Sequence, residues 1–224
     1  VVSVFLLFLG HIARIFDISL PVVYTGARVV GGGVLMVLVY QLIRMIFPES
    51  YKKRIVAFCF VLFGTYFWGW GTNGPTVAPL THAWTELDPI FRWSFVPHHL
   101  WSKVGMLAVF LLLLQPSTIL HNSLFILLVF VMGFTNPVAY ATFVPTLALY
   151  LLFSLARGGL ARLDWRAVGA IGVAGLVLLY HRYLQTNIFP WTSYLLWEQT
   201  LSYKVNPLDY AFSLGPTLLL FILA

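Results

Sequence analysis

The stretch Val104–Ala156, VGMLAVFLLLLQPSTILHNSLFILLVFVMGFTNPVAYATFVPTLALYLLFSLA, decides the fold of this chain. It contains no Asp, Glu, Lys or Arg, and His121 is its only side chain that titrates near neutral pH. A soluble protein of 224 residues cannot bury so much contiguous apolar chain. The stretch therefore predicts an all-α, polytopic transmembrane helical bundle.

The composition of the whole chain agrees with this class. Hydrophobic residues make up 60% and charged residues only 9% of the sequence, against about 25% charged residues in soluble proteins. The excess of 13 Lys and Arg over 7 Asp and Glu is explained by membrane topology, so no nucleic-acid partner is expected. Cys59 is the single cysteine, which excludes a disulfide within the chain. Because the sequence starts at Val1 and stops inside an apolar run, we expect one transmembrane domain, 1–224, incomplete at both ends.

A scan for apolar segments of membrane-spanning length gives six spans and part of a seventh. They are Pro21–Phe47, Arg54–Trp70, Leu100–Leu114, Ile119–Phe134, Val138–Leu155, Arg166–Gln185 and the truncated Tyr210–Ala224. The two spans on either side of Gln115-Pro116 are short, which fits tilted helices or a re-entrant turn. Asn136-Pro137 is interpreted as a helix-terminating turn.

The distribution of basic residues gives the spans a direction. The connections after the first and fifth spans carry seven basic and two acidic residues, whereas the opposite side carries six basic and five acidic residues. The first side is therefore predicted to be cytoplasmic. Five of the seven acids, five of the six His and seven of the eight Trp then lie on or near the outer side. A transporter more often places polar residues at the bilayer midplane, so the pattern favours a protein that works at the outer surface.

The first outer loop, 71–99, carries the densest group of candidate functional residues. The loop contains Glu86, Asp88, Arg92, His98 and His99, and Lys103 follows at the start of the next span. A carboxylate, histidines and a base near a helix start suit phosphate binding or proton transfer. The alternative is a solvated interfacial loop with an aromatic belt. Adjacent histidines diverge, and their combination with Glu86 or His82 matches no metal motif, so no metal is expected.

Three further groups of outer residues have two interpretations each. In the second outer loop, 186–209, Trp191 and Trp197 suit a sugar or a lipid headgroup, or simply anchor the loop at the interface. Arg182, at the outer end of the sixth span, either binds phosphate or snorkels to the membrane surface. Arg28, near the outer end of the first span, is a further phosphate candidate.

The opening stretch, 4–48, resembles the GT-C superfamily of polytopic glycosyltransferases, which includes protein O-mannosyltransferases and aminoarabinose transferases. The resemblance rests on an apolar helix, a turn, a second helix rich in small residues and a basic, aromatic end. The matching residues are Gly10-His11, Ala13 to Ser19, Arg28, Gly31 to Gly33, Tyr40, Arg44 and Phe47-Pro48. It implies that 1–16 is a juxtamembrane helix on the outer surface and Pro21–Phe47 the family's second transmembrane helix. The long loop 71–99 departs from the shorter turn with an Asp that better-known members have.

The resemblance implies transfer of a sugar from a polyprenyl-phosphate donor to an acceptor at the extracytoplasmic face of the plasma membrane. For such a transfer, Glu86 and His98 are the catalytic candidates of this sequence. The resemblance implies that the acidic base of the family precedes Val1. The donor phosphate is assigned to Arg28, Arg92, Lys103 and Arg182, and substrate binding to Asp88, His99, Trp191 and Trp197. The rival hypotheses are a transporter or flippase of a lipid-linked intermediate, which predicts internal repeats, and a non-catalytic membrane scaffold.

Overall fold

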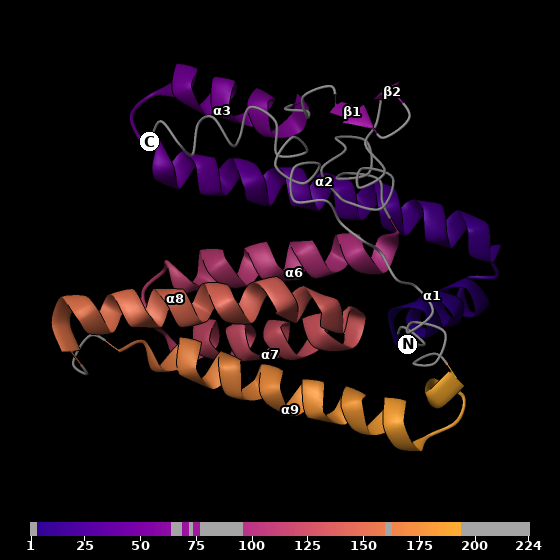
Figure 1. Ribbon diagram of the computed structural model, residues 1–224. Helices are drawn as coiled ribbons and strands as arrows, with labels where there is room; N and C mark the ends of the chain where they lie inside the picture. Colours follow the sequence, from indigo (N-terminus) through magenta and orange to yellow (C-terminus); the bar gives the residue numbers. More distant parts are fainter. Residues whose placement is uncertain (1–3, 64–68, 72–73, 77–95, 160–162, 194–224) are drawn as a thin grey trace. The chain divides into compact units, whose positions relative to one another are not determined.

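The computed structural model describes residues 4–63, 69–71, 74–76, 96–159 and 163–193. These residues divide between two compact units, which are described separately. The first unit contains the chain up to Leu38 and its return from Val96 onward, and the second begins at Val39. In the described residues the chain is helical apart from one pair of three-residue strands, which confirms the predicted helical class (Figure 1).

The helices of the first unit begin and end where local sequence signals demand it. Helix α6 (Pro97–Leu113) starts with proline at its first position, and the turn at Gln115-Pro116 follows it. Helix α7 (Ile119–Thr135) starts at Thr118, whose side chain accepts from His121 N at 3.1 Å. It ends at Asn136-Pro137, which confirms the predicted turn. The 3-10 turn η1 (Pro137–Ala139) leads directly into helix α8 (Tyr140–Gly158).

Helix α9 (Trp165–Asn187) follows α8 and runs back alongside it. It packs against α7 and α8, and α7 also packs against α6. Hydrogen bonds at both ends show that consecutive helices run antiparallel. Arg166 at the start of α9 contacts the carbonyls at the end of α6, while His181 near the end of α9 contacts Gly133 O near the end of α7. The four helices therefore alternate in direction along the chain.

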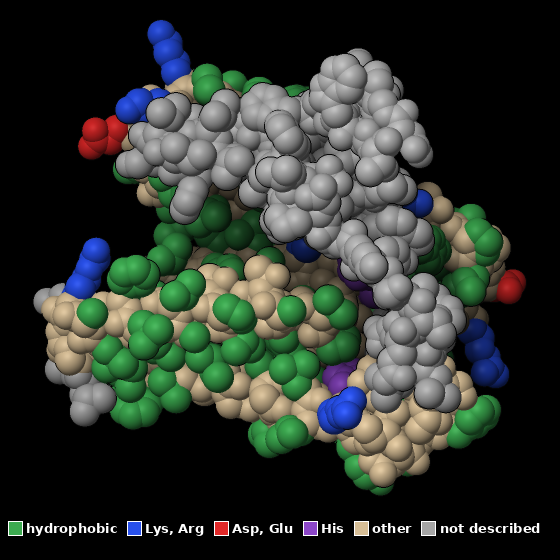
Figure 2. Space-filling model, in the orientation of Figure 1, with side chains coloured by type: hydrophobic (Ala, Val, Ile, Leu, Met, Phe, Trp, Pro, Cys, Tyr) green, Lys and Arg blue, Asp and Glu red, His purple; other side chains and the backbone are tan. Residues whose placement is uncertain are grey.

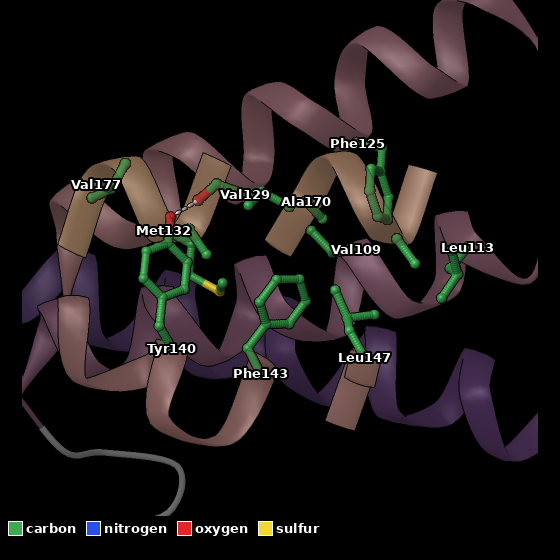
Figure 3. Close-up of a cluster of buried hydrophobic side chains, with 12 residues drawn as sticks. Val109, Leu113, Phe125, Val129, Met132, Tyr140, Phe143, Leu147, Ala170 and Val177 are labelled. Carbon is green, nitrogen blue, oxygen red and sulfur yellow. Dashed lines mark hydrogen bonds between the residues drawn. The ribbon is translucent and has the colours of Figure 1, made fainter. Parts of the chain in front are cut away.

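A continuous cluster of buried side chains joins these four helices (Figure 3). Tyr140, Phe143 and Leu147 point from α8 into it and meet Val109 of α6 and Met132 of α7. Helix α9 contributes small residues that allow its close approach, namely Ala167, Ala170 and Ala174, all fully buried. The outward side of α8 and α9 is covered by apolar side chains, with Lys and Arg near its ends (Figure 2). Such a surface suits contact with lipid.

The first unit also contains helix α1 (Val4–Ile15) and the first part of helix α2 (Leu20–Ile46). Asp17, with φ of 52°, makes the sharp turn between them. The prediction of a helix at the start of the chain is thus confirmed, and the first predicted span matches α2 within a residue at each end.

The second unit contains the end of α2, helix α3 (Tyr51–Phe63) and strands β1 (Gly69–Gly71) and β2 (Gly74–Thr76). The two strands pair antiparallel, with Gly71 opposite Gly74. Arg54 Nε donates to Phe47 O at 2.8 Å, and the rings of Tyr40 and Phe58 meet edge to face at 5.6 Å. These contacts join α2 and α3 as a helical hairpin.

Three helical segments of the described chain are long and apolar enough to cross a membrane. They are Leu20–Ile46, Pro137–Gly158 and Trp165–Asn187. The predicted spans in α3, α6 and α7 are present as helices, but their described lengths are 13, 17 and 17 residues, below the ~20 that a perpendicular span requires. The truncated span 210–224 lies outside the described residues. The fold is thus that of a helical membrane protein with at least three helices able to span.

Candidate functional site

Six of the ten predicted site residues lie in the described part of the chain. These are Arg28, His98, His99, Lys103, Arg182 and Trp191. Glu86, Asp88, Arg92 and Trp197 lie outside the described residues. The structure therefore describes the candidates on helix α6 (Pro97–Leu113), which follows the loop 71–99. The site roles of Glu86 and Asp88 in that loop stay predictions.

The start of α6 and the end of α7 together form a buried polar cluster of His99, Ser102 and Asn136. Asn136 Nδ2 lies 3.1 Å from His99 Nδ1 and 3.5 Å from Ser102 Oγ. Ser102 Oγ in turn donates to His99 O at 2.7 Å. Ser102 and Asn136 are 2% and 7% exposed, so this is a specific buried network in an otherwise apolar bundle.

The hydrogen bonds of Asn136 fix the tautomer of His99. Asn136 Oδ1 accepts from Val138 N at 3.2 Å, so the amide nitrogen is the atom that faces His99. An amide nitrogen only donates, and His99 Nδ1 must therefore accept. When the ring is neutral, its proton is therefore on Nε2.

His98 has a buried ring nitrogen that makes no hydrogen bond to any residue the structure describes. This atom is Nδ1, and the ring lies 4.4 Å from the ring of His99. His98 precedes the predicted span, and its burial, together with the neighbouring His99, lowers its pKa to about 4. The imidazole is therefore neutral at pH 7. A neutral imidazole exchanges hydrogen bonds with a hydroxyl or a phosphate oxygen but does not supply a positive charge.

The remaining described candidates, Lys103, Arg182, Trp191 and Arg28, differ in position and burial. Lys103 follows one turn after His99 on α6. Arg182 is exposed on α9, whereas its neighbour His181 is buried and its Nε2 lies 3.2 Å from Gly133 O. These two sequence neighbours thus have different places in the structure, a core histidine and a surface arginine. Trp191 is half-buried in a short helical turn after α9, and Arg28 is half-buried on α2.

An apolar groove of about 750 Å³ is lined in part by sequence neighbours of the polar cluster, Trp101 and Thr135. It lies between α1, α6 and α7. Its walls include Phe5 and Phe8 of α1, Ala108 of α6 and Val131 of α7. The groove reaches Thr135, the residue directly before Asn136. α6 and α7 thus carry both an apolar groove and, on the residues next to Trp101 and Thr135, a group of polar atoms, a combination that suits an amphiphilic ligand.

Asn136 and Ser102 are functional candidates that the sequence analysis missed. Asn136 was interpreted only as a turn residue, although an asparagine beside a proline at the end of a long apolar helix is also a buried-polar signal. Its contact with His99 joins residues 37 positions apart, which spacing along the chain does not reveal. Among the described residues no three His, Cys, Asp or Glu side chains come together as a metal site.

No protein-family model matches this sequence, and neither a curated protein nor a solved structure matches it. The resemblance to the GT-C superfamily therefore rests on the residues quoted in the sequence analysis.

Proposed function

We propose that this chain is part of a membrane glycosyltransferase that uses a polyprenyl-phosphate-linked sugar at the outer membrane face, with a GT-C-like bundle of six spans and a seventh. The observations that carry the proposal are the apolar groove lined by Trp101 and Thr135, and the polar cluster that their neighbours Ser102 and Asn136 form with His99. A polyprenyl phosphate has the complementary form, because a long apolar chain is followed directly by a polar head.

The polar groups near the groove have roles that follow from their chemistry. His98, neutral and with Nδ1 unpartnered among the described residues, hydrogen-bonds a sugar hydroxyl or a phosphate oxygen. Positive charge for the phosphate comes from Lys103 and Arg92, with Arg28 and Arg182 as further candidates. His99 and Asp88 bind the sugar or acceptor, and the second loop adds the aromatic rings of Trp191 and Trp197.

The reaction is a substitution at the anomeric carbon of the sugar. The acceptor hydroxyl oxygen forms a bond to that carbon, and the bond from the carbon to the phosphate oxygen breaks. The leaving polyprenyl phosphate takes the electron pair, and a carboxylate takes the hydroxyl proton. By the GT-C resemblance this carboxylate precedes Val1, and Glu86, in the loop before α6, helps to position the acceptor or the donor.

The test is transfer of radiolabelled sugar from a polyprenyl-phosphate donor by the purified full-length protein. Loss of one hydrogen-bonding group from a partly dry site costs roughly a hundredfold in rate. His98→Ala and Arg92→Ala are each expected to lower the specific activity on that scale without loss of folded protein. His121→Ala is the matched control, because His121 is half-buried at the opposite end of α6 and α7 from His98, where its Nδ1 lies 3.0 Å from Pro116 O.

Two outcomes would contradict the proposal. If wild-type protein moves labelled donor across a bilayer without transferring its sugar, the protein is a flippase. If His98→Ala and Arg92→Ala both keep wild-type specific activity, the site is elsewhere.

A further inference from the structure

The last turn of α7 leaves the buried carbonyl of Gly133 without its usual backbone donor. In an α-helix this carbonyl accepts from the N–H of the residue four positions later, which here is Pro137, and proline has no N–H. The N–H groups on either side of Pro137 are engaged elsewhere. Asn136 N donates to Met132 O at 2.9 Å, and Val138 N donates to Asn136 Oδ1 at 3.2 Å. The carbonyl of Gly133 therefore depends on a donor from another element, because a buried polar group without a partner is costly in an apolar bundle.

His181 of α9 supplies that donor. Its Nε2 lies 3.2 Å from Gly133 O, and the residue is only 8% exposed. A carbonyl oxygen only accepts, so Nε2 of His181 carries a proton. The imidazole ring also lies 5.8 Å from the ring of Phe134, the residue of α7 that follows Gly133. A hydrogen bond and a ring contact thus tie α9 to the end of α7.

The same turn of α7 carries the contact with α6. Asn136 follows Gly133 by three residues, and its Nδ2 donates to His99 Nδ1 at 3.1 Å. The backbone N–H of Asn136 still donates to Met132 O, so the position of its side chain follows that of the last helical turn. A hydrogen bond weakens steeply when its distance and angle leave a narrow range. A shift of this turn away from α9 would therefore weaken the bond between Asn136 and His99.

We infer that His181 is a positioning residue of the polar cluster: its hydrogen bond to Gly133 O holds the end of α7 so that Asn136 meets His99 and keeps His99 Nδ1 as an acceptor. His181 acts through Asn136, because it is buried on a different helix from His99. The effect on the tautomer of His99 is independent of the proposed function, and only the consequence for sugar transfer rests on it. A change of tautomer exchanges the donor and the acceptor nitrogen of the ring, so a ring that binds sugar or acceptor would present the wrong atom.

The first measurement is NMR of the imidazole nitrogens in the full-length protein, with isotope-labelled histidine, in lipid nanodiscs at a pH where the rings are neutral. The signals of His99 and His181 are assigned by replacing each histidine singly with glutamine. In wild type, the proton of both rings is expected on Nε2. A proton on Nδ1 of His181 would overturn the inference without the need for any further variant.

Variants at position 181 test whether the hydrogen bond acts on His99. His181→Leu removes the donor, and the proton of His99 is then expected to distribute between both ring nitrogens. His181→Gln keeps an N–H that reaches the same carbonyl, so the wild-type tautomer of His99 is expected. If His181→Leu does not fold, His181→Asn, whose amide is one methylene too short, takes its place with the same expectation.

Tyr140→Phe is the matched control for a general loss of packing. It removes another buried hydrogen bond to α7, from the Tyr140 hydroxyl to Val129 O at 2.6 Å, and is expected to leave the tautomer of His99 unchanged. Three results would overturn the inference. They are an unchanged His99 tautomer in the folded variant without the donor, an equal change in Tyr140→Phe, and loss of the wild-type tautomer in His181→Gln.

Sugar transfer by the same variants connects the position of His99 to the reaction. His181→Leu is expected to lower kcat roughly tenfold to a hundredfold, because misplacement of a binding group costs rate on that scale, and His181→Gln is expected to restore most of it. Wild-type kcat in His181→Leu would overturn the inference. Absence of transfer by the wild-type protein, with the expected tautomers in all variants, would instead overturn the proposed function and leave the positioning of His99 intact.

Discussion

At the scale of single residues, Gly133 and Tyr140 show why this apolar bundle has one packing arrangement. Tyr140 is 1% exposed, and its hydroxyl donates to Val129 O at 2.6 Å, so its polar atom is satisfied inside the core (Figure 3). The ring reaches that carbonyl only by passing directly over Gly133. A Cβ there would lie 2.3 Å from the Tyr140 hydroxyl and 2.5 Å from its ring. The contact between α7 and α8 thus requires glycine at this position.

Gly133→Ala is therefore expected to destabilise the protein by about 1–3 kcal/mol, the usual cost of overpacking a core. The measurement is thermal unfolding of the purified protein in detergent. Gly172→Ala is the control, since a Cβ on Gly172 meets no atom within 4 Å and alanine favours helix by up to about 1 kcal/mol. Equal melting temperatures for Gly133→Ala and wild type would show that the Tyr140 packing described here is wrong.

At the scale of elements, Arg166 joins the start of α9 to the end of α6. Its guanidinium donates to Leu112 O, Leu113 O and Gln115 O at 3.0–3.3 Å, and so satisfies carbonyls that a helix end leaves without partners. It also forms a two-pronged ion pair with Asp164 at 3.0 and 2.8 Å. Asp164 in turn caps α9 by accepting from Arg166 N at 3.0 Å. The Arg166–Asp164 pair thus supplies hydrogen bonds to the last carbonyls of α6 and to the first N–H groups of α9.

This pair gives a pH-dependent contribution to stability. Burial raises the pKa of Asp164, but the hydrogen bonds and charge of Arg166 outweigh it and hold this pKa below its ordinary value. A lowered pKa in the folded state means that the contribution is complete above the unfolded-state pKa of about 3.9 and is lost as the pH falls through the folded-state pKa.

Asp164→Asn keeps a capping side chain but removes the charge, so it isolates this electrostatic contribution. The variant is expected to melt below wild type at pH 7 by a constant amount down to about pH 4, and the difference should shrink below that. Thermal unfolding across a pH series measures it. A difference that instead grows toward low pH would contradict the assigned ion pair.

Sequence patterns predicted the elements well because each helix end carries a local signal. The predicted span Pro21–Phe47 differs by one residue at each end from α2, and Ile119–Phe134 by one residue from α7. At α6 the predicted start, Leu100, is late by one turn, because the scan excluded the polar pair His98-His99 although Pro97 begins the helix. The candidate site was less predictable. The contacts of His99 with Asn136 and of Trp101 with Ala27 depend on helix packing, which periodicity does not encode.

At the scale of the molecule, the four-helix set α6–α9 has two chemically different ends. The end that holds the α6–α7 turn and Asp164 also carries Arg157 and Arg166. The opposite end holds His98, His99, Lys103, Asn136 and, near the end of α9, Arg182. Over the whole sequence, the connections on the first side carry seven basic and two acidic residues, against six basic and five acidic residues on the other side. An excess of basic residues marks the cytoplasmic side of a membrane protein. The first end should therefore face the cytoplasm, and the polar cluster should lie toward the outer leaflet.

Cysteine labelling of intact cells decides this orientation. With Cys59→Ser as the background, Ser117→Cys marks the α6–α7 turn and Asn187→Cys marks the end of α9; both positions are exposed. A membrane-impermeant thiol reagent is expected to label position 187 and not position 117, and to label both after permeabilisation, which controls for reactivity. By the same charge argument Lys52→Cys should be protected and Trp84→Cys and Trp197→Cys labelled. Labelling of position 117 but not of position 187 would put the polar cluster on the cytoplasmic side. The phosphate of the donor would then have to be reached from the cytoplasm, and a transferase at the outer face would be ruled out.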